Sequence, residues 1–107
     1  MALVTVEAGI CGMYTTIKAT ADQPYGMVTL EITSDCPHIQ KMAAELTEVR
    51  STGEISYRGE GPRTLRAAAK HLPHAACVVP PAIIKAIEVA AGLALPKDPV
   101  IHISKEG

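Results

Sequence analysis

Aromatic residues are almost absent from this chain, which has three Tyr and neither Phe nor Trp among its 107 residues. A platform that stacks single-stranded nucleic acid on aromatic rings is therefore excluded. An excess of charge of one sign is also lacking: the formal net charge is −1, so no electrostatic footprint points to DNA, RNA or an anionic membrane. No apolar run approaches the roughly 20 residues that cross a bilayer. We therefore expect neither a nucleic-acid partner nor a membrane partner.

The signatures of common enzyme classes are missing as well. The chain has no P-loop, no dinucleotide-binding fingerprint, no Ser/His/Asp arrangement and no paired carboxylates that would indicate hydrolysis. Nothing in the sequence therefore indicates an enzyme. The first residues lack the basic-then-apolar pattern of a signal peptide, and three cysteines are an odd number, which argues against a disulfide framework. We expect a cytoplasmic protein whose cysteines are core filler, metal ligands or reactive thiols.

Apolar residues make up 48% of the chain, enough for one aliphatic core in a single domain covering residues 1–107. Three segments, residues 2–8, 13–20 and 27–33, alternate between apolar and polar side chains. That period predicts strands with one buried face. Because the turns between them are short, the three strands should form an antiparallel meander.

Helical spacing of apolar residues replaces alternation further along the chain. It predicts three helices, Pro37–Val49, Pro62–Leu72 and Pro80–Ala91, each opened by proline. The polar segment 50–61 is interpreted mainly as loop, with a short strand at Glu54–Arg58 as an alternative, and Val100–Ser104 is predicted to be a last strand. The fold class is therefore α+β: a mostly antiparallel sheet of three or four strands with three helices on one face, in the order βββαααβ.

Cys36 is the residue around which the predicted function is organised. It follows the third strand, and Pro37 is placed as the first residue of a helix. Free backbone N–H groups and the positive end of the helix dipole would surround the sulfur, and both favour thiolate over thiol. A thiolate is the form that binds a metal or attacks an electrophile.

The up-and-down path of the chain predicts that Cys11, Cys36 and Cys77 lie at one end of the sheet. Cys11 follows a rising strand, Cys36 follows the next rising strand, and Cys77 follows a helix that climbs back. Three thiolates that meet there suit Zn²⁺ or an iron–sulfur cluster, because soft sulfur ligands match those ions. His74 or His38, each near a cysteine, is a candidate fourth ligand. We interpret the basic helical face of Arg63, Arg66 and Lys70 as solvated surface.

Cys11-Gly12 between two strands, Cys36 at a helix start, and Cys77 before the last long helix resemble the U-type iron–sulfur scaffold proteins. These are the IscU-like proteins and the N-terminal domain of NifU, with the SufE/NifU-type fold. The resemblance covers roughly residues 2–92. It implies a cluster-assembly scaffold with Cys11, Cys36 and Cys77 as ligands, Gly12 allowing close backbone approach, and a cysteine desulfurase or a cluster-recipient protein as partner. Met13 and Ala76 stand where that family has Asp and, usually, His.

Two other functions remain open from the sequence. Cys36-Pro37 is similar to the Cys-Pro of small sulfur-carrier proteins such as TusA, in which one activated thiolate accepts and donates sulfur. Cys36 would then work alone. The third alternative is a non-catalytic interaction domain in which all three cysteines are structural.

Overall fold

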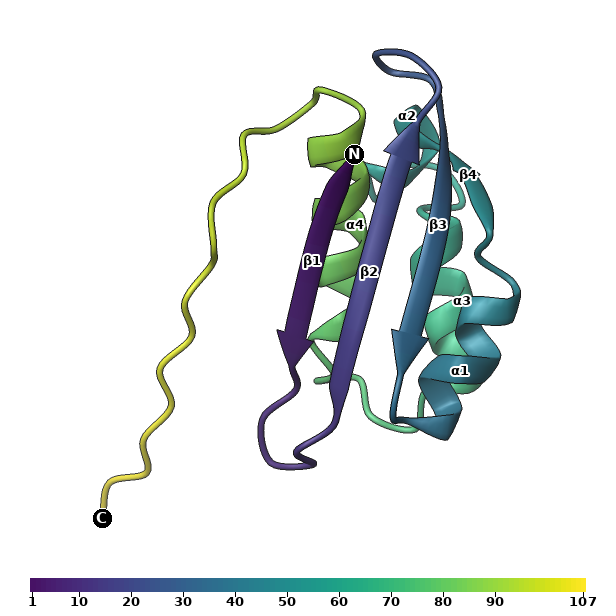
Figure 1. Ribbon diagram of the computed structural model, residues 1–107. Helices are drawn as coiled ribbons and strands as arrows, with labels where there is room; N and C mark the ends of the chain where they lie inside the picture. The colour runs from purple at the N-terminus through teal and green to yellow at the C-terminus, as the bar shows by residue number, and fades with distance from the viewer.

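The computed structural model describes all residues, 1–107, and consists of one four-stranded sheet with its helices on one face (Figure 1). The elements in chain order are β1 (Ala2–Glu7), β2 (Tyr14–Ala21), β3 (Met27–Ser34), α1 (Pro37–Ala44), β4 (Glu48–Arg50), α2 (Ser51–Glu54), α3 (Arg63–His71) and α4 (Val79–Ala90). Neighbouring strands are antiparallel throughout, in the order β1-β2-β3-β4. The α+β class predicted from the sequence is confirmed.

The three long strands form where the sequence alternates. In β2, Ile17 and Ala19 are fully buried, whereas Lys18 between them is exposed. The register places Ile17 opposite Ile32 and Ala19 opposite Leu30, so apolar side chains meet on the face that the helices cover. Such cross-strand pairs stabilise the sheet, and a slip of one residue would turn them all to water.

The helices cover that face in two groups. The longest helix, α4, lies across β1 and β2 and buries Ile83, Ala86 and Ile87 completely. The shorter α1 packs on β3 and α3 through Ile39 and Met42. The buried cluster has 16 members, and all of them are aliphatic side chains or methionine. No cysteine belongs to it, which leaves all three thiols nearer the surface.

The fourth strand lies elsewhere than predicted. The first helix ends at Ala44 rather than Val49, and residues 48–50 pair with the start of β3, where Met27 faces Arg50. The carbonyl of Thr47 accepts a hydrogen bond from the Leu30 N–H at 2.9 Å, which joins this segment to β3 before the strand begins. Backbone pairing with the edge of β3 therefore determines the conformation of residues 47–50, although the spacing of Leu46 and Val49 favours a helix.

Residues 51–54 form one helical turn instead of loop, and no strand exists at Glu54–Arg58. The reason is the carboxylate of Glu54, which is buried beneath the start of α3 and accepts hydrogen bonds from the N–H groups of Arg63 and Thr64, both at 2.9 Å. An extended segment would carry this side chain away from those donors.

The predicted strand Val100–Ser104 is not formed. The chain after α4 is extended and exposed, and it stands apart from the rest of the fold (Figure 1). A strand needs a neighbour to take its backbone hydrogen bonds, and none lies beside this segment. No helix combines the length and the apolar character needed to cross a bilayer.

Candidate functional site

The three segments that carry the cysteines lie at one end of the sheet. The β1–β2 turn holds Cys11, the β3–α1 junction holds Cys36, and the connector between α3 and α4 holds Cys77. β1 and β3 end there and α4 begins there, so the three segments share the lower end in Figure 1. This common end is the starting point for any shared chemistry of the thiols.

Cys36 is the N-cap residue of α1, as the Cys-Pro pair predicted. Its backbone is extended, at φ −83° and ψ 121°, and Pro37 occupies the first helical turn. The Cys36 N–H donates to Ser34 Oγ at 3.1 Å, and its carbonyl accepts from the Gln40 N–H at 3.0 Å. The thiol makes no capping hydrogen bond and is half-buried against the edge of the core. The backbone of Cys36 is therefore held in place, and its half-buried thiol is still open to a ligand.

Cys77 lies in the connector just before α4. Its N–H donates to the carbonyl of His74 at 3.3 Å, which closes a turn. The thiol is half-buried and packs on the core, whereas the imidazole of His74 is exposed. His38, in the first turn of α1, is exposed as well.

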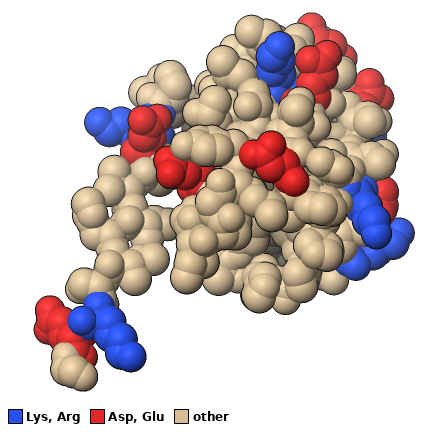
Figure 2. Space-filling view, turned by 60° about the horizontal axis from the view of Figure 1, so that its bottom comes forward, with Lys and Arg blue, Asp and Glu red and all other residues tan.

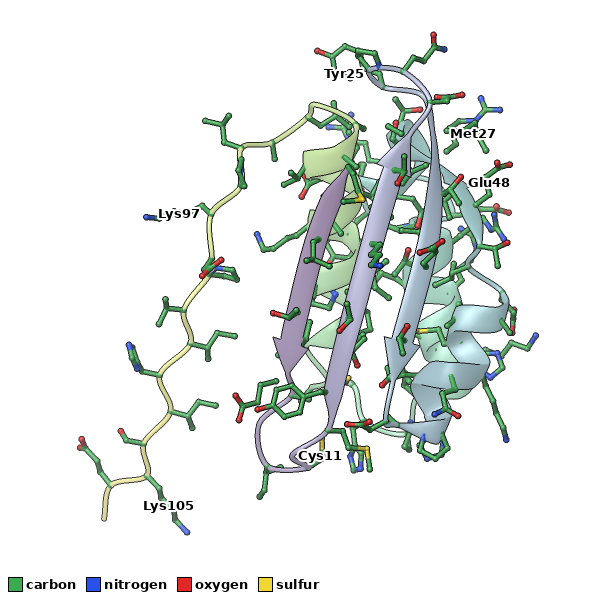
Figure 3. The ribbon with its side chains drawn as sticks, in the orientation of Figure 1. Cys11, Tyr25, Met27, Glu48, Lys97 and Lys105 are labelled. Carbon is green, nitrogen blue, oxygen red and sulfur yellow. The ribbon has the colours of Figure 1, made fainter.

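Cys11 is exposed at the tip of the β1–β2 turn (Figure 3). Gly9 and Gly12 on either side have φ of +93° and +68°, in the left-handed region that favours glycine. Nothing lies within 4 Å of where a Cβ of Gly12 would stand. The turn therefore needs Gly12 for its backbone conformation, and the close approach expected at this glycine is absent from the structure.

Asp35 ties the Cys11 turn to the Cys36 junction. The N–H of Tyr14, at the end of the turn, donates to Asp35 Oδ2 at 3.2 Å, and the Asp35 N–H donates to the Tyr14 carbonyl at 3.1 Å. Sequence reasoning missed this residue, although its place directly before Cys36 marked it as a polar neighbour of the site. The link joins the end of the Cys11 turn to the residue before Cys36.

The sulfurs themselves do not lie close together. No three His, Cys, Asp or Glu side chains are placed so that they could hold a metal ion. The fold therefore brings the cysteine segments to one end, but it does not bring Cys11, Cys36 and Cys77, with His38 or His74, into a ligand group.

Comparison with known proteins identifies the chain by family. Residues 2–103 match the model of a family described as a family of unknown function, DUF6951. The chain belongs to the DUF6951 family. No curated protein and no solved structure matches it. The DUF6951 match includes all three cysteines and most of the segment after α4.

The basic face of α3 is occupied by contacts within the DUF6951 chain. The guanidinium of Arg63 donates to the carbonyls of Glu45 and Glu48, both at 3.0 Å. Arg66 donates to two carbonyls of the preceding loop, and Lys70 pairs with Glu45 at 3.3 Å. On the face shown in Figure 2, charges of both signs are scattered and neither gathers into a large patch. These cations therefore lie at the surface, as predicted, and their contacts are made within the chain.

Two open hollows lie away from the cysteines in the DUF6951 fold. One of about 180 Å³ lies between the end of α1 and α3, and one of about 300 Å³ lies between α2, α3 and α4. No cysteine lines either of them. The thiols remain the groups with the most distinctive chemistry on this molecule.

Proposed function

We propose that this protein binds a metal ion or an iron–sulfur cluster through Cys11, Cys36 and Cys77. The observation that carries the proposal is the common end of the fold that the three cysteine segments share, although 25 (36 − 11) and 41 (77 − 36) residues separate them along the chain (Figure 1). Thiolates suit both Zn²⁺ and iron–sulfur clusters. The resemblance to U-type scaffold proteins favours the cluster.

The burial of the thiols supports a role beyond packing. Cysteine that serves as a small apolar side chain is commonly buried. Here the 16-member core excludes all three: Cys11 is exposed, and Cys36 and Cys77 are half-buried at the edge of the core. Each sits at a turn or a helix start, where backbone N–H groups are free to hydrogen-bond sulfur.

Binding would have to draw the three sulfurs together. The Cys11 turn is the segment best suited to move, because its thiol is exposed and no neighbour lies within 4 Å of a Cβ built on Gly9 or Gly12. Metal sites are commonly completed only when the metal binds, so that binding and ordering are coupled. His74 or His38, both exposed, would supply a fourth ligand from the same end.

The test is anaerobic loading of the full chain, with iron and sulfide in one series and Zn²⁺ in another. Visible absorbance with matched iron and sulfide content supports a cluster, and one equivalent of tightly held zinc supports a zinc site. Each of Cys11→Ser, Cys36→Ser and Cys77→Ser should abolish tight binding. His102→Ala is the matched control, because this histidine lies on the exposed segment after α4. Binding that survives Cys36→Ser, or absence of binding to the unaltered chain, rejects the proposal.

A second candidate function rests on Cys36 alone. Its thiol lies at the start of an eight-residue helix, makes no capping hydrogen bond and is half-exposed. As a sulfur carrier, the Cys36 thiolate would attack the outer sulfur of a desulfurase persulfide. The donor's S–S bond would break, and the donor cysteine would leave as thiolate.

Mass spectrometry separates the two candidates. After incubation with a cysteine desulfurase and cysteine, a carrier gains the mass of one sulfur atom on Cys36, and Cys11→Ser and Cys77→Ser leave this gain intact. A metal or cluster site requires all three thiols.

A further inference from the structure

The segment after α4 has no partner within the chain. It leaves the body beyond Ala94, after which no residue takes part in a hydrogen bond or an ion pair. Val100, Ile101 and Ile103 are 71%, 68% and 90% exposed. Large aliphatic side chains that all face water indicate a surface that another element covers.

The pattern of this segment is that of a strand. Val100–Ser104 is rich in β-branched residues and is extended in the structure. Pro96 and Pro99 precede it, and each disfavours the helical conformation at the residue before it, so the chain leading into the segment stays extended. The family model runs to residue 103, so most of the segment belongs to the part that the family shares.

The free edge of β1 lacks the features that normally prevent another strand from pairing with a sheet edge. β1 pairs with β2 along one side only, and its register from Ala2 to Glu7 is continuous, with no bulge. It contains no proline and no lysine, and its one charged residue is Glu7 at the end. The opposite edge, β4, has three residues with Glu48 and Arg50 at its ends. Natural edges are protected by short length and charge, and only β4 has that protection.

We propose that two copies of the chain exchange these segments, so that Val100–Ser104 of each copy pairs with β1 of the other. Each chain carries one donor strand and one acceptor edge, so reciprocal exchange between two copies leaves neither unpaired and gives a two-fold dimer with five strands in each sheet. The N–H and C=O groups on the free side of β1 gain partners, and Ile101 and Ile103, which share one face of an added strand, can be turned toward the helix-covered side of the sheet.

A second copy is a better occupant of this edge than the chain's own segment. In Figure 1 the segment descends on the β1 side of the molecule in the direction in which β1 itself runs. Its own β1 would therefore receive it as a parallel strand. A segment from a partner is free to add antiparallel, and antiparallel pairing is the more stable arrangement per residue.

The first test measures the mass of the full chain in solution by light scattering and sedimentation over a range of concentrations. A reducing agent is present because Cys11 is exposed and could form an intermolecular disulfide. We expect twice the chain mass of 11.3 kDa. Ile101→Asp/Ile103→Asp should weaken the dimer by ~10-fold or more, because carboxylates at these positions must be desolvated on pairing. The matched control Lys97→Ala/Lys105→Ala, which changes the same segment outside the strand, should leave the dimer intact.

Hydrogen exchange supplies the second test. Amides of β1 that face away from β2 should be protected in the dimer and should lose that protection in Ile101→Asp/Ile103→Asp, with no change at Ile17 or Leu30. A monomer whose β1 amides are unprotected overturns the proposal, as does a dimer that persists in the double variant. A monomer whose β1 amides are protected by its own segment also overturns it. None of these results depends on metal or sulfur binding.

Discussion

Replacement of Glu54 by alanine should be among the most destabilising changes in this protein. The residue is 2% exposed, and its carboxylate accepts three hydrogen bonds. Oε2 accepts from the Arg63 N–H at 2.9 Å, and Oε1 accepts from the Thr64 N–H at 2.9 Å and the Thr64 hydroxyl at 2.6 Å. Pro62, the N-cap residue of α3, has no side-chain cap of its own. Glu54 therefore supplies the missing cap from a distance in sequence.

The expected loss of stability depends on the three hydrogen-bond donors that the substitution leaves without an acceptor. Hydrogen bonds to a charged group contribute about 1.5–3 kcal/mol each, but burial of the carboxylate offsets part of that gain. Glu54 lines the open hollow of about 300 Å³, so water can replace some of the lost partners. Loss of a strong cap costs up to about 2 kcal/mol by itself. We expect Glu54→Ala to lower the free energy of unfolding by about 2–4 kcal/mol.

Glu54→Gln separates shape from charge at the same site. The amide keeps one acceptor oxygen but turns an NH₂ group toward an N–H donor of α3. We therefore expect a loss of about 1–2 kcal/mol, between the unaltered chain and the alanine variant.

Urea denaturation followed by far-ultraviolet circular dichroism measures the change, since the chain has no Trp for fluorescence. Glu60→Ala is the matched control, because Glu60 is exposed in the loop between α2 and α3 and its side chain makes no hydrogen bond. It should stay within about 0.5 kcal/mol of the unaltered chain. If Glu54→Ala lost less than about 1 kcal/mol, the carboxylate would not be the cap of α3 and the reasoning would be refuted.

Three further predictions test the core, the surface charges and the cysteine turn. Ile87→Ala, at a fully buried position of α4, should lower the free energy of unfolding measured by urea denaturation by about 2–5 kcal/mol. Ile10→Ala, at a fully exposed position, should change it by less than about 0.5 kcal/mol. The pKa of Glu45 is lowered mainly by its hydrogen bond with His71 and next by that with Lys70. The stabilisation from these contacts is therefore fully present above the usual pKa of the carboxyl, and it is lost as the pH falls through the lowered pKa. In a carboxyl NMR titration, His71→Ala should return this pKa toward its usual range, and an unchanged value would contradict the assignment. Gly12→Ala should cost about 1 kcal/mol because φ is +68° there, and a neutral effect would show that the turn adapts.

Alternation and helical spacing in the sequence were sufficient for the main body of the fold. Val28 and Leu30 are buried in β3, as alternation predicted, and Ile83 and Ile87 face the sheet from α4. These patterns are local and strong, since each element buries one face against a single partner layer. The extended Cys36 cap with Pro37 behind it was also predictable, because the preference depends only on neighbours in sequence.

The candidate site was predictable only in part. That Cys11, Cys36 and Cys77 share one end follows from counting the directions of strands and helices. Their separation does not, because the distance between two sulfurs depends on the angles of turns and on side-chain packing. Asp35, which ties two of these segments through Tyr14, was missed for the same reason.

The sequence by itself determined the α+β class, the three long strands, the three longer helices and the end of the sheet where the cysteines lie. Only the tertiary structure decided the place of β4 beside β3, the burial of Glu54 under α3 and the lack of a partner for Val100–Ser104. The physical reason is common to all three. Each depends on a hydrogen-bonding partner far away in the chain, and a residue's local pattern carries no information about which distant donor or acceptor will be beside it.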